Sequence, residues 1–192
     1  AGAVRRMAAL GRARVLGAGL PSDAPALSRL RRAEALVRRG WVEAGFLLFL
    51  LVWAAGLPPS NLGLLADRLA LTGGPGRLLR RWGSTWRLRP RLSREGRRSR
   101  IRRSIAGLSP AQIGALASGL PPAASARLCG VAFSPAVLSI GGRDLLEAGA
   151  PAGPAIGRAL AATLAAREDG MIGASQELDF ALRRARGRKR MP

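Results

Sequence analysis

The sequence GGRDLLEAGAPAGPAIGRAL at positions 141–160 predicts a short helix, a break and the start of a longer helix. Asp144 is of a residue type that caps a short helix, and the glycines and prolines that follow interrupt it. Pro154 then fits the first turn of the longer helix, because the first helical N–H groups need no intrahelical acceptor. Gly153 and Gly157 leave that helix start bare, so a second backbone or a phosphate group can approach it. The pattern leaves two interpretations, a packed pair of helices and a phosphate-binding helix start.

Helical segments separated by glycine and proline account for most of the remaining chain, and the pair Ser109–Pro110 marks one helix start. The most apolar segment, residues 44–57, spans about 21 Å as a helix and is shorter than the ~20 residues that cross a bilayer. We predict a buried central helix here, and a membrane span is the alternative. The expected fold is all-α, an elongated array of helical hairpins. It comprises a helical domain at 26–182, a basic N-terminal arm at 1–25 and a basic C-terminal tail at 183–192.

Positive charge dominates the composition, with 32 Lys and Arg residues against 11 Asp and Glu and a formal net charge of +21. Self-repulsion on this scale destabilises an isolated domain, and a polyanion is the usual partner that neutralises it. RNA or DNA is therefore favoured over an anionic membrane surface. The arginines of segment 26–39 are expected to form a solvated charged face. Positions 1–20 hold four arginines and no acid, which is typical of an organellar transit peptide, an RNA-binding arm or a plain helix.

The densest basic region is 77–103, where twelve arginines accompany a single acid, Glu95. So many guanidinium groups cannot be buried unpaired, and 87–103 is therefore the main candidate for RNA contact. Trp82 and Trp86 lie one helical turn apart, which fits either base stacking beside phosphate contacts or a core face. The predicted contacts here and in the tail neutralise phosphates and follow RNA shape rather than base edges. They are Arg77, Arg80, Arg81, Arg87, Arg89, Arg91, Arg94, Arg97, Arg98, Arg100, Arg102, Arg103, Arg183, Arg184, Arg186, Arg188, Lys189 and Arg190.

Residues that carry catalysis are scarce, since the chain has no histidine, no tyrosine and one cysteine. A single cysteine without histidine excludes a disulfide within the chain and a Cys/His zinc site. Cys129 stands in the apolar context ARLCGVAF and is predicted to be a small core residue. The glycine-rich TGGPG at 72–76 lacks the Lys-Ser/Thr pair of a phosphate loop. The acidic neighbours Glu168–Asp169 do not form an Asp-x-Asp motif. We therefore expect no enzyme activity from this chain by itself, and no cofactor or metal ion.

Residues 142–172, which close with DGMI at 169–172, resemble the C-terminal region of the tRNA nucleotidyltransferase (CCA-adding enzyme) and bacterial poly(A) polymerase family. LADRLALTGGPGRLLRRW at 65–82 is more loosely similar to the body segment of that family. The resemblance implies a helical, RNA-holding body and tail. The catalytic head of that family, with its phosphate-holding glycine motif and Asp-x-Asp metal ligands, has no counterpart among these residues.

These observations favour a non-catalytic RNA-binding protein, repurposed from the RNA-holding half of a tRNA nucleotidyltransferase. Its expected place is a structural, rRNA-binding role in an organellar (mitochondrial) ribosome, beside other proteins of that ribonucleoprotein. The expected location is the mitochondrial matrix, with the cytoplasm as the alternative, and no membrane partner is expected. A second hypothesis is the tRNA-binding subunit of a split CCA-adding enzyme or poly(A) polymerase. A third, which rests on residues 44–57, is a membrane-associated or helix-packing scaffold.

Overall fold

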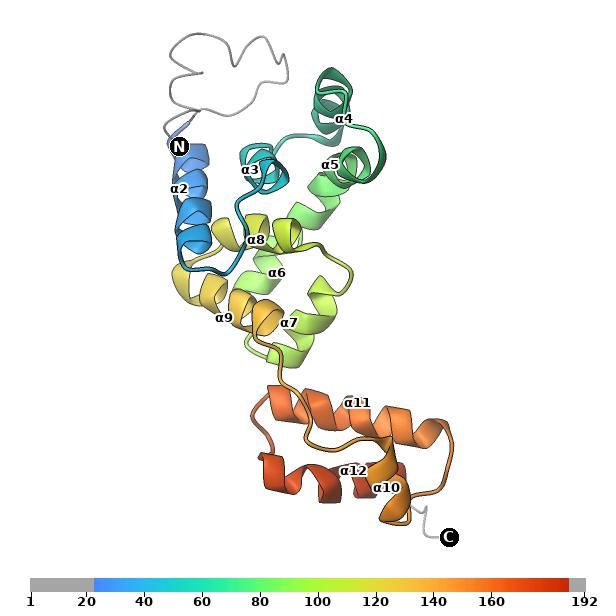
Figure 1. Ribbon diagram of the computed structural model, residues 1–192. Coiled ribbons are helices and arrows are strands. Elements are labelled where there is room, and N and C mark those ends of the chain that lie inside the picture. The colour runs from blue at the N-terminus through green and yellow to red at the C-terminus, as the bar shows by residue number, and fades with distance from the viewer. Residues whose placement is uncertain (1–22, 187–192) are drawn as a thin grey trace. The chain divides into compact units, whose positions relative to one another are not determined.

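The computed structural model describes residues 23–186 (Figure 1). Over these residues the chain forms α-helices and one 3₁₀ helix and no strand, which confirms the predicted all-α class. Nearly all of the predicted N-terminal arm lies outside this range. The predicted domain divides into two compact units, which we call unit 1 (residues 23–94 and 104–133) and unit 2 (residues 95–103 and 134–186).

Unit 1 begins its helices at residues that the chemistry of helix ends prefers. The Asp23 carboxylate accepts the Ala26 N–H at 2.9 Å and caps the first helix. At Ser109 the hydroxyl accepts the Gln112 N–H and the Gln112 side chain accepts the Ser109 N–H, so the predicted start at Ser109–Pro110 is confirmed as a capping box. The helices of unit 1 are α2 (Ala24–Arg38), α3 (Phe46–Trp53), α4 (Pro59–Arg68), α5 (Gly73–Trp86), α6 (Arg89–Arg94), α8 (Pro110–Ser118) and α9 (Pro122–Phe133).

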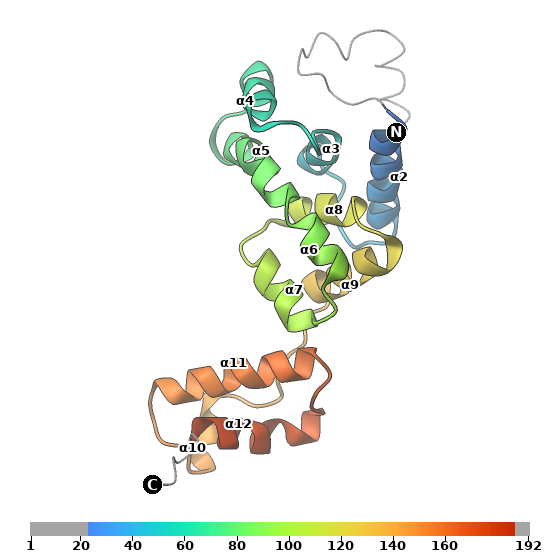
Figure 2. The same ribbon diagram turned by 180° about the vertical axis from the view of Figure 1, so that it is seen from behind.

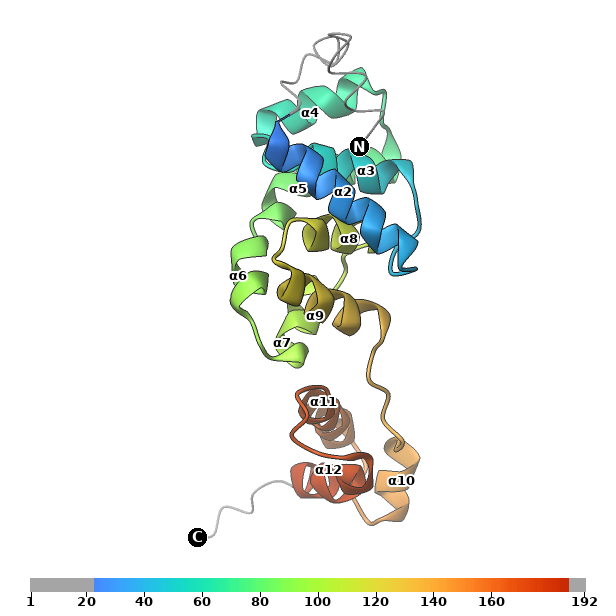
Figure 3. The ribbon, with the colours of Figure 1, turned by 90° about the vertical axis from the view of Figure 1, so that its left-hand side faces the viewer.

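The core of unit 1 lies between α2, α3, α5, α8 and α9. Helix α2 packs on α3 and α8, while α4 pairs with α5 and α8 with α9 (Figure 3). Helix α6 lies against α9 (Figure 2). Leucines fill most of the interior, and Trp82 is its largest fully buried side chain. At ~25 cal/mol per Å² of apolar surface, such aromatic and leucine side chains supply most of the stabilisation of the unit.

The apolar segment at 44–57 enters this core only in its middle, and its helix is shorter than expected. Helix α3 has 8 residues. Leu48 and residues 50–55 are buried, whereas Ala44, Gly45 and Phe46 are exposed, Phe46 to 64%. Gly45 is extended at its start, and Gly56, at φ +90°, turns the chain in a left-handed conformation that favours glycine. Among the described residues, no helix combines the length and the hydropathy of a membrane span.

Unit 2 is a smaller assembly of α10 (Gly142–Glu147), α11 (Pro154–Glu168), a 3₁₀ turn (Ala174–Gln176), α12 (Glu177–Ala185) and most of α7 (Arg98–Ile105). Helices α11 and α12 run antiparallel, and α10 contacts both (Figure 1). The core between them contains the fully buried Leu145 and four buried alanines, with partly buried isoleucines and leucines packed against them. Because this core is small, polar anchors add substantially to the stability of unit 2.

The corner at 141–160 has the predicted helix–break–helix form. Pro154 occupies the first turn of α11, and Gly153 has φ +134°, which L side chains rarely adopt. Asp144 caps α10 from inside the helix, since its carboxylate accepts the Gly141 N–H at 2.6 Å. It therefore acts at the third position of the helix and not before it.

Cys129 is fully buried in α9, which confirms its predicted place in the core. Burial raises the pKa of its thiol to about 11, against a smaller opposing effect of the Ser125 side chain. The reactive thiolate is therefore scarce at pH 8. We expect a thiol reagent at pH 8 to label the folded chain at least roughly a hundredfold more slowly than the urea-unfolded chain. Equal labelling rates would contradict a buried thiol.

Candidate nucleic-acid interface

The arginine run at 77–103 is carried by three helices and the turns between them. Helix α5 holds the first three arginines, its C-terminal cap and α6 hold four, and the turn before α7 and α7 itself hold five. The boundary between the units falls after Arg94, so seven of these arginines belong to unit 1 and five to unit 2. The predicted contact segment 87–103 is therefore divided between two units.

Most of these side chains are open to solvent, and only Arg89 and Arg102 are half-buried. Arg80 pairs with Asp67, and Arg100 lies 3.8 Å from Glu95. Both pairs are largely exposed on the arginine side, where such contacts contribute ~0–1 kcal/mol and are screened by salt. Within residues 23–186, seven exposed arginines of the run form no ion pair with a carboxylate. They are Arg77, Arg81, Arg87, Arg91, Arg94, Arg97 and Arg103.

The arginine-rich helix α7 is held in unit 2 by two carboxylates at the end of α11. Asp169 accepts both the backbone N–H of Ser99 at 2.9 Å and its hydroxyl at 2.8 Å, and so caps the first turn of α7. Glu168, with 3% of its side chain exposed, pairs with Arg102. Arg102 thus has a partner inside the fold. Its charge stabilises the position of α7 and adds little to the positive potential at the surface.

Of the two tryptophans of α5, Trp82 belongs to the core and Trp86 lies at its edge. Trp82 is fully buried, and its ring lies 5.6 Å from that of Trp86 in a tilted arrangement. Trp86 is half-buried, with the guanidinium of Arg89 4.9 Å from its ring centre and that of Arg29 at 6.0 Å. The core interpretation is confirmed for Trp82, and the surroundings of Trp86 are already occupied by protein groups.

Arg29 departs from the expected solvated face of segment 26–39. It is half-buried and donates to the carbonyl oxygen of Ala55 at 3.4 Å. Sequence periodicity placed it on the charged side of α2, but α2 packs against α3 over part of that side. The Arg-Arg spacing in SRLRR does not distinguish a half-buried arginine from a solvated one.

The C-terminal arginines begin inside a helix and not in a tail. Helix α12 continues to Ala185, so Arg183 and Arg184 are helical, with both side chains exposed. Basic residues in the last turn complement the helix dipole, which favours this extension. Arg184 lies 5.2 Å from the ring centre of Phe180, and Arg186 donates to the Ala148 carbonyl at 3.1 Å. Arg188, Lys189 and Arg190 lie outside the described residues.

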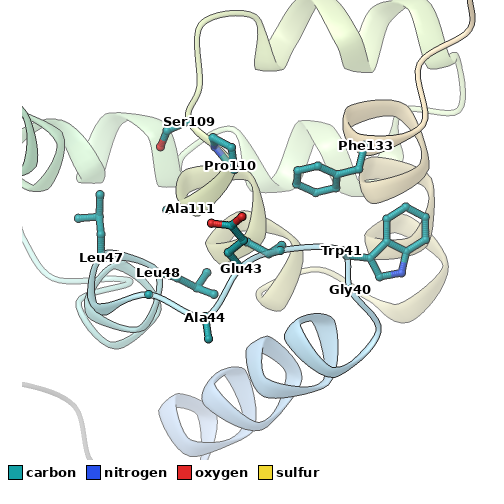
Figure 4. Close-up of a pocket in the computed structure, with 12 residues that line it drawn as sticks. Gly40, Trp41, Glu43, Ala44, Leu47, Leu48, Ser109, Pro110, Ala111 and Phe133 are labelled. Carbon is teal, nitrogen blue, oxygen red and sulfur yellow. The ribbon is translucent and has the colours of Figure 1, made fainter.

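A separate apolar pocket of about 620 Å³ lies in unit 1 between the α2–α3 connection, the start of α8 and the end of α9 (Figure 4). Trp41 and Phe133 form one wall, with ring centres 6.4 Å apart, and Leu47 and Leu48 form the opposite one. Its one charged lining residue is Glu43, which repels phosphate. This pocket is therefore outside the candidate polyanion surface.

Three carboxylates of unit 2, those of Glu168, Asp169 and Glu177, accept hydrogen bonds within the fold. Across residues 23–186, no cluster of three or more His, Cys, Asp or Glu side chains is arranged to hold a metal ion. In unit 2 the buried Glu177 accepts from Ser139 and Arg167, as Glu168 and Asp169 do from residues of α7. Each of these acids is thus occupied by an intramolecular donor.

Comparison of the chain with protein-family models, with curated proteins and with solved structures finds no match. The resemblance of residues 142–172 to the nucleotidyltransferase family therefore stays a prediction from the sequence motif.

Proposed function

We propose that this chain is a non-catalytic RNA-binding protein that holds the phosphate backbone of a structured RNA. The observation that carries the proposal is a set of exposed arginines whose side chains form no ion pair with a carboxylate of the described chain, five of them in unit 1 and two in unit 2. Exposed guanidinium groups at this density repel one another, and phosphate is the ligand whose geometry their planar forks match.

The expected mode of binding follows from the tryptophans that accompany these arginines. The burial of Trp82 and the covering of Trp86 remove the stacking platform that base recognition in single strands uses. The arginines are then expected to contact the phosphate backbone and to recognise the shape of the RNA rather than its base edges. The RNA we expect is ribosomal, within an organellar ribonucleoprotein, and tRNA is the second candidate.

Salt dependence tests this function. We expect the affinity for a structured rRNA fragment, measured by fluorescence anisotropy, to fall about a thousandfold or more between 50 and 200 mM KCl, because six or more neutralised phosphates release their counterions. The affinity for a tRNA of equal length, measured in parallel, shows which of the two RNA classes the chain binds more tightly. An affinity that is flat over this salt range would contradict the proposal.

A further inference from the structure

A second, more polar pocket of about 290 Å³ lies in unit 1, between α6 and the corner that joins α8 to α9. Helix α6 contributes Arg89, Pro90, Ser93 and Arg94, and the corner contributes residues 119–121. Arg89 and Arg94 are five residues apart on a short helix, and both line the same space. No carboxylate is among the residues that line it.

Neighbouring guanidinium groups add to the positive charge around this pocket. Arg32 donates to the carbonyl of Leu120, a lining residue, at 3.3 Å. Arg127 donates to the carbonyl of Ser93, another lining residue, also at 3.3 Å. Three segments far apart in the sequence, in α2, α6 and α9, therefore bring arginines to one place, which charge density along the sequence does not predict.

Arg29 does not line the pocket, but it feels two of the arginines around it. Burial lowers the pKa of Arg29 from its ordinary value, and Asp23 opposes this, while repulsion by Arg89 and Arg32 lowers the pKa further. An anion bound beside Arg89 would offset part of this positive charge. Helix α9 starts at Pro122, directly after the lining residue Pro121, so the positive end of its dipole adjoins the pocket.

We propose that this pocket binds one phosphate group of the RNA backbone, with Arg89 and Arg94 as its direct ligands. The inference rests on the proposed function and adds a defined subsite to it. Two guanidinium forks on one short helix can hold a phosphodiester through charge-assisted hydrogen bonds, and Arg32 and Arg127 keep the walls positive. The remaining exposed arginines supply the general electrostatic attraction, whereas this pocket fixes the register of the RNA on unit 1.

The test compares two double variants of the full chain that remove the same charge from the same eight residues. One is Arg89→Gln with Arg94→Gln, which removes the two arginines that line the pocket. The control is Arg87→Gln with Arg91→Gln, two exposed arginines that do not line it. Affinity for the rRNA fragment is measured at 150 mM KCl, and urea midpoints confirm that both variants fold. Arg94→Gln alone, set against Arg91→Gln alone, repeats the comparison without disturbing the Arg89–Trp86 contact.

We expect the control to lose about threefold in affinity from the charge alone, and the pocket variant to lose at least about tenfold more than the control. Arg89→Lys with Arg94→Lys should recover only part of that loss, because an ammonium group lacks the planar fork. Equal losses in the two double variants would overturn the phosphate site and leave the proposed function standing. If the unaltered chain binds no RNA, the proposed function fails, and the RNA-phosphate site fails with it.

Discussion

Replacement of Glu177 by alanine is expected to unfold unit 2 while unit 1 stays folded. The Glu177 carboxylate, with 1% of its side chain exposed, accepts three hydrogen bonds. Two come from the backbone N–H and hydroxyl of Ser139, each at 2.7 Å, and one from Nε of Arg167 at 3.1 Å. This one group ties the start of α12 to the segment before α10 and to the end of α11.

The expected loss is large because nothing replaces the carboxylate. Its removal leaves the two Ser139 donors without an acceptor inside the fold, whereas the Arg167 guanidinium, 37% exposed, can turn to water. Loss of these charge-assisted hydrogen bonds costs about 2–4 kcal/mol. The small core around Leu145 has limited apolar burial to offset that loss. For a small unit with a total stability near the low end of ~5–15 kcal/mol, the native state would no longer be well populated.

The chain provides separate probes for its two units, since all four tryptophans lie in unit 1. In a urea titration of the Glu177→Ala variant, far-UV circular dichroism should lose the helices of unit 2 before tryptophan fluorescence changes. The matched control is Asp179→Asn, an exposed acid in the same helix, which should lose at most about 0.5 kcal/mol. Coincident transitions at the wild-type midpoint would contradict the anchoring role of Glu177.

Acid provides a second readout of the same carboxylate. Burial by itself raises the pKa of Glu177, but the Ser139 hydrogen bonds and the Arg167 charge outweigh it and hold the pKa below its ordinary value. The stabilisation is therefore complete above the unfolded pKa of about 4.3 and is lost as the pH falls through the lower folded pKa. Glu177→Ala should remove this part of the acid sensitivity of unit 2.

Local signals in the sequence predicted the helix ends well, because each depends on a few adjacent residues. Ser109 caps α8 and Pro154 opens α11, as their chemistry requires. The burial of the middle of the apolar segment, residues 48–55, also followed from its composition, whereas the exposure of Phe46 at its start did not. The end of α12 was placed too early, since Arg183 and Arg184 were assigned to a tail although arginine is a good helix former.

Long-range pairings account for what the sequence did not reveal. Asp169 caps α7 through Ser99, 70 positions away in the sequence, and no local pattern links the two. This pairing holds α7 in unit 2, to which five of the twelve arginines of the run belong, so a stretch with one composition is divided between two units. The pocket between α6 and the α8–α9 corner was missed for the same reason, because Arg32 and Arg127 reach it from distant helices.

Gly119→Ala is expected to destabilise unit 1 by about 2–3 kcal/mol, since it forces overpacking against a ring that cannot withdraw. A Cβ at this position would overlap Cη2 of Trp86 and lie 2.9–3.0 Å from its Cζ3 and Cζ2. Trp86 is itself backed by the buried Trp82 and covered by Arg89. Gly119 has φ −90°, which any residue adopts, so the clash alone is responsible for the loss. The measurement is the urea midpoint followed by tryptophan fluorescence.

The same substitution at Gly63 makes the matched control, because a Cβ there meets nothing within 4 Å and the residue lies inside α4. Gly63→Ala should raise stability by about 0.5–1 kcal/mol through helix propensity and a less flexible unfolded chain. Combining Gly119→Ala with Trp86→Leu should cost less than the sum of the two single changes, since the smaller side chain makes room for the methyl group. Strictly additive losses would mean that position 119 does not press on Trp86. The α8–α9 corner also forms one wall of the arginine-lined pocket. Additive losses would leave the close approach of α5 to this corner without an explanation.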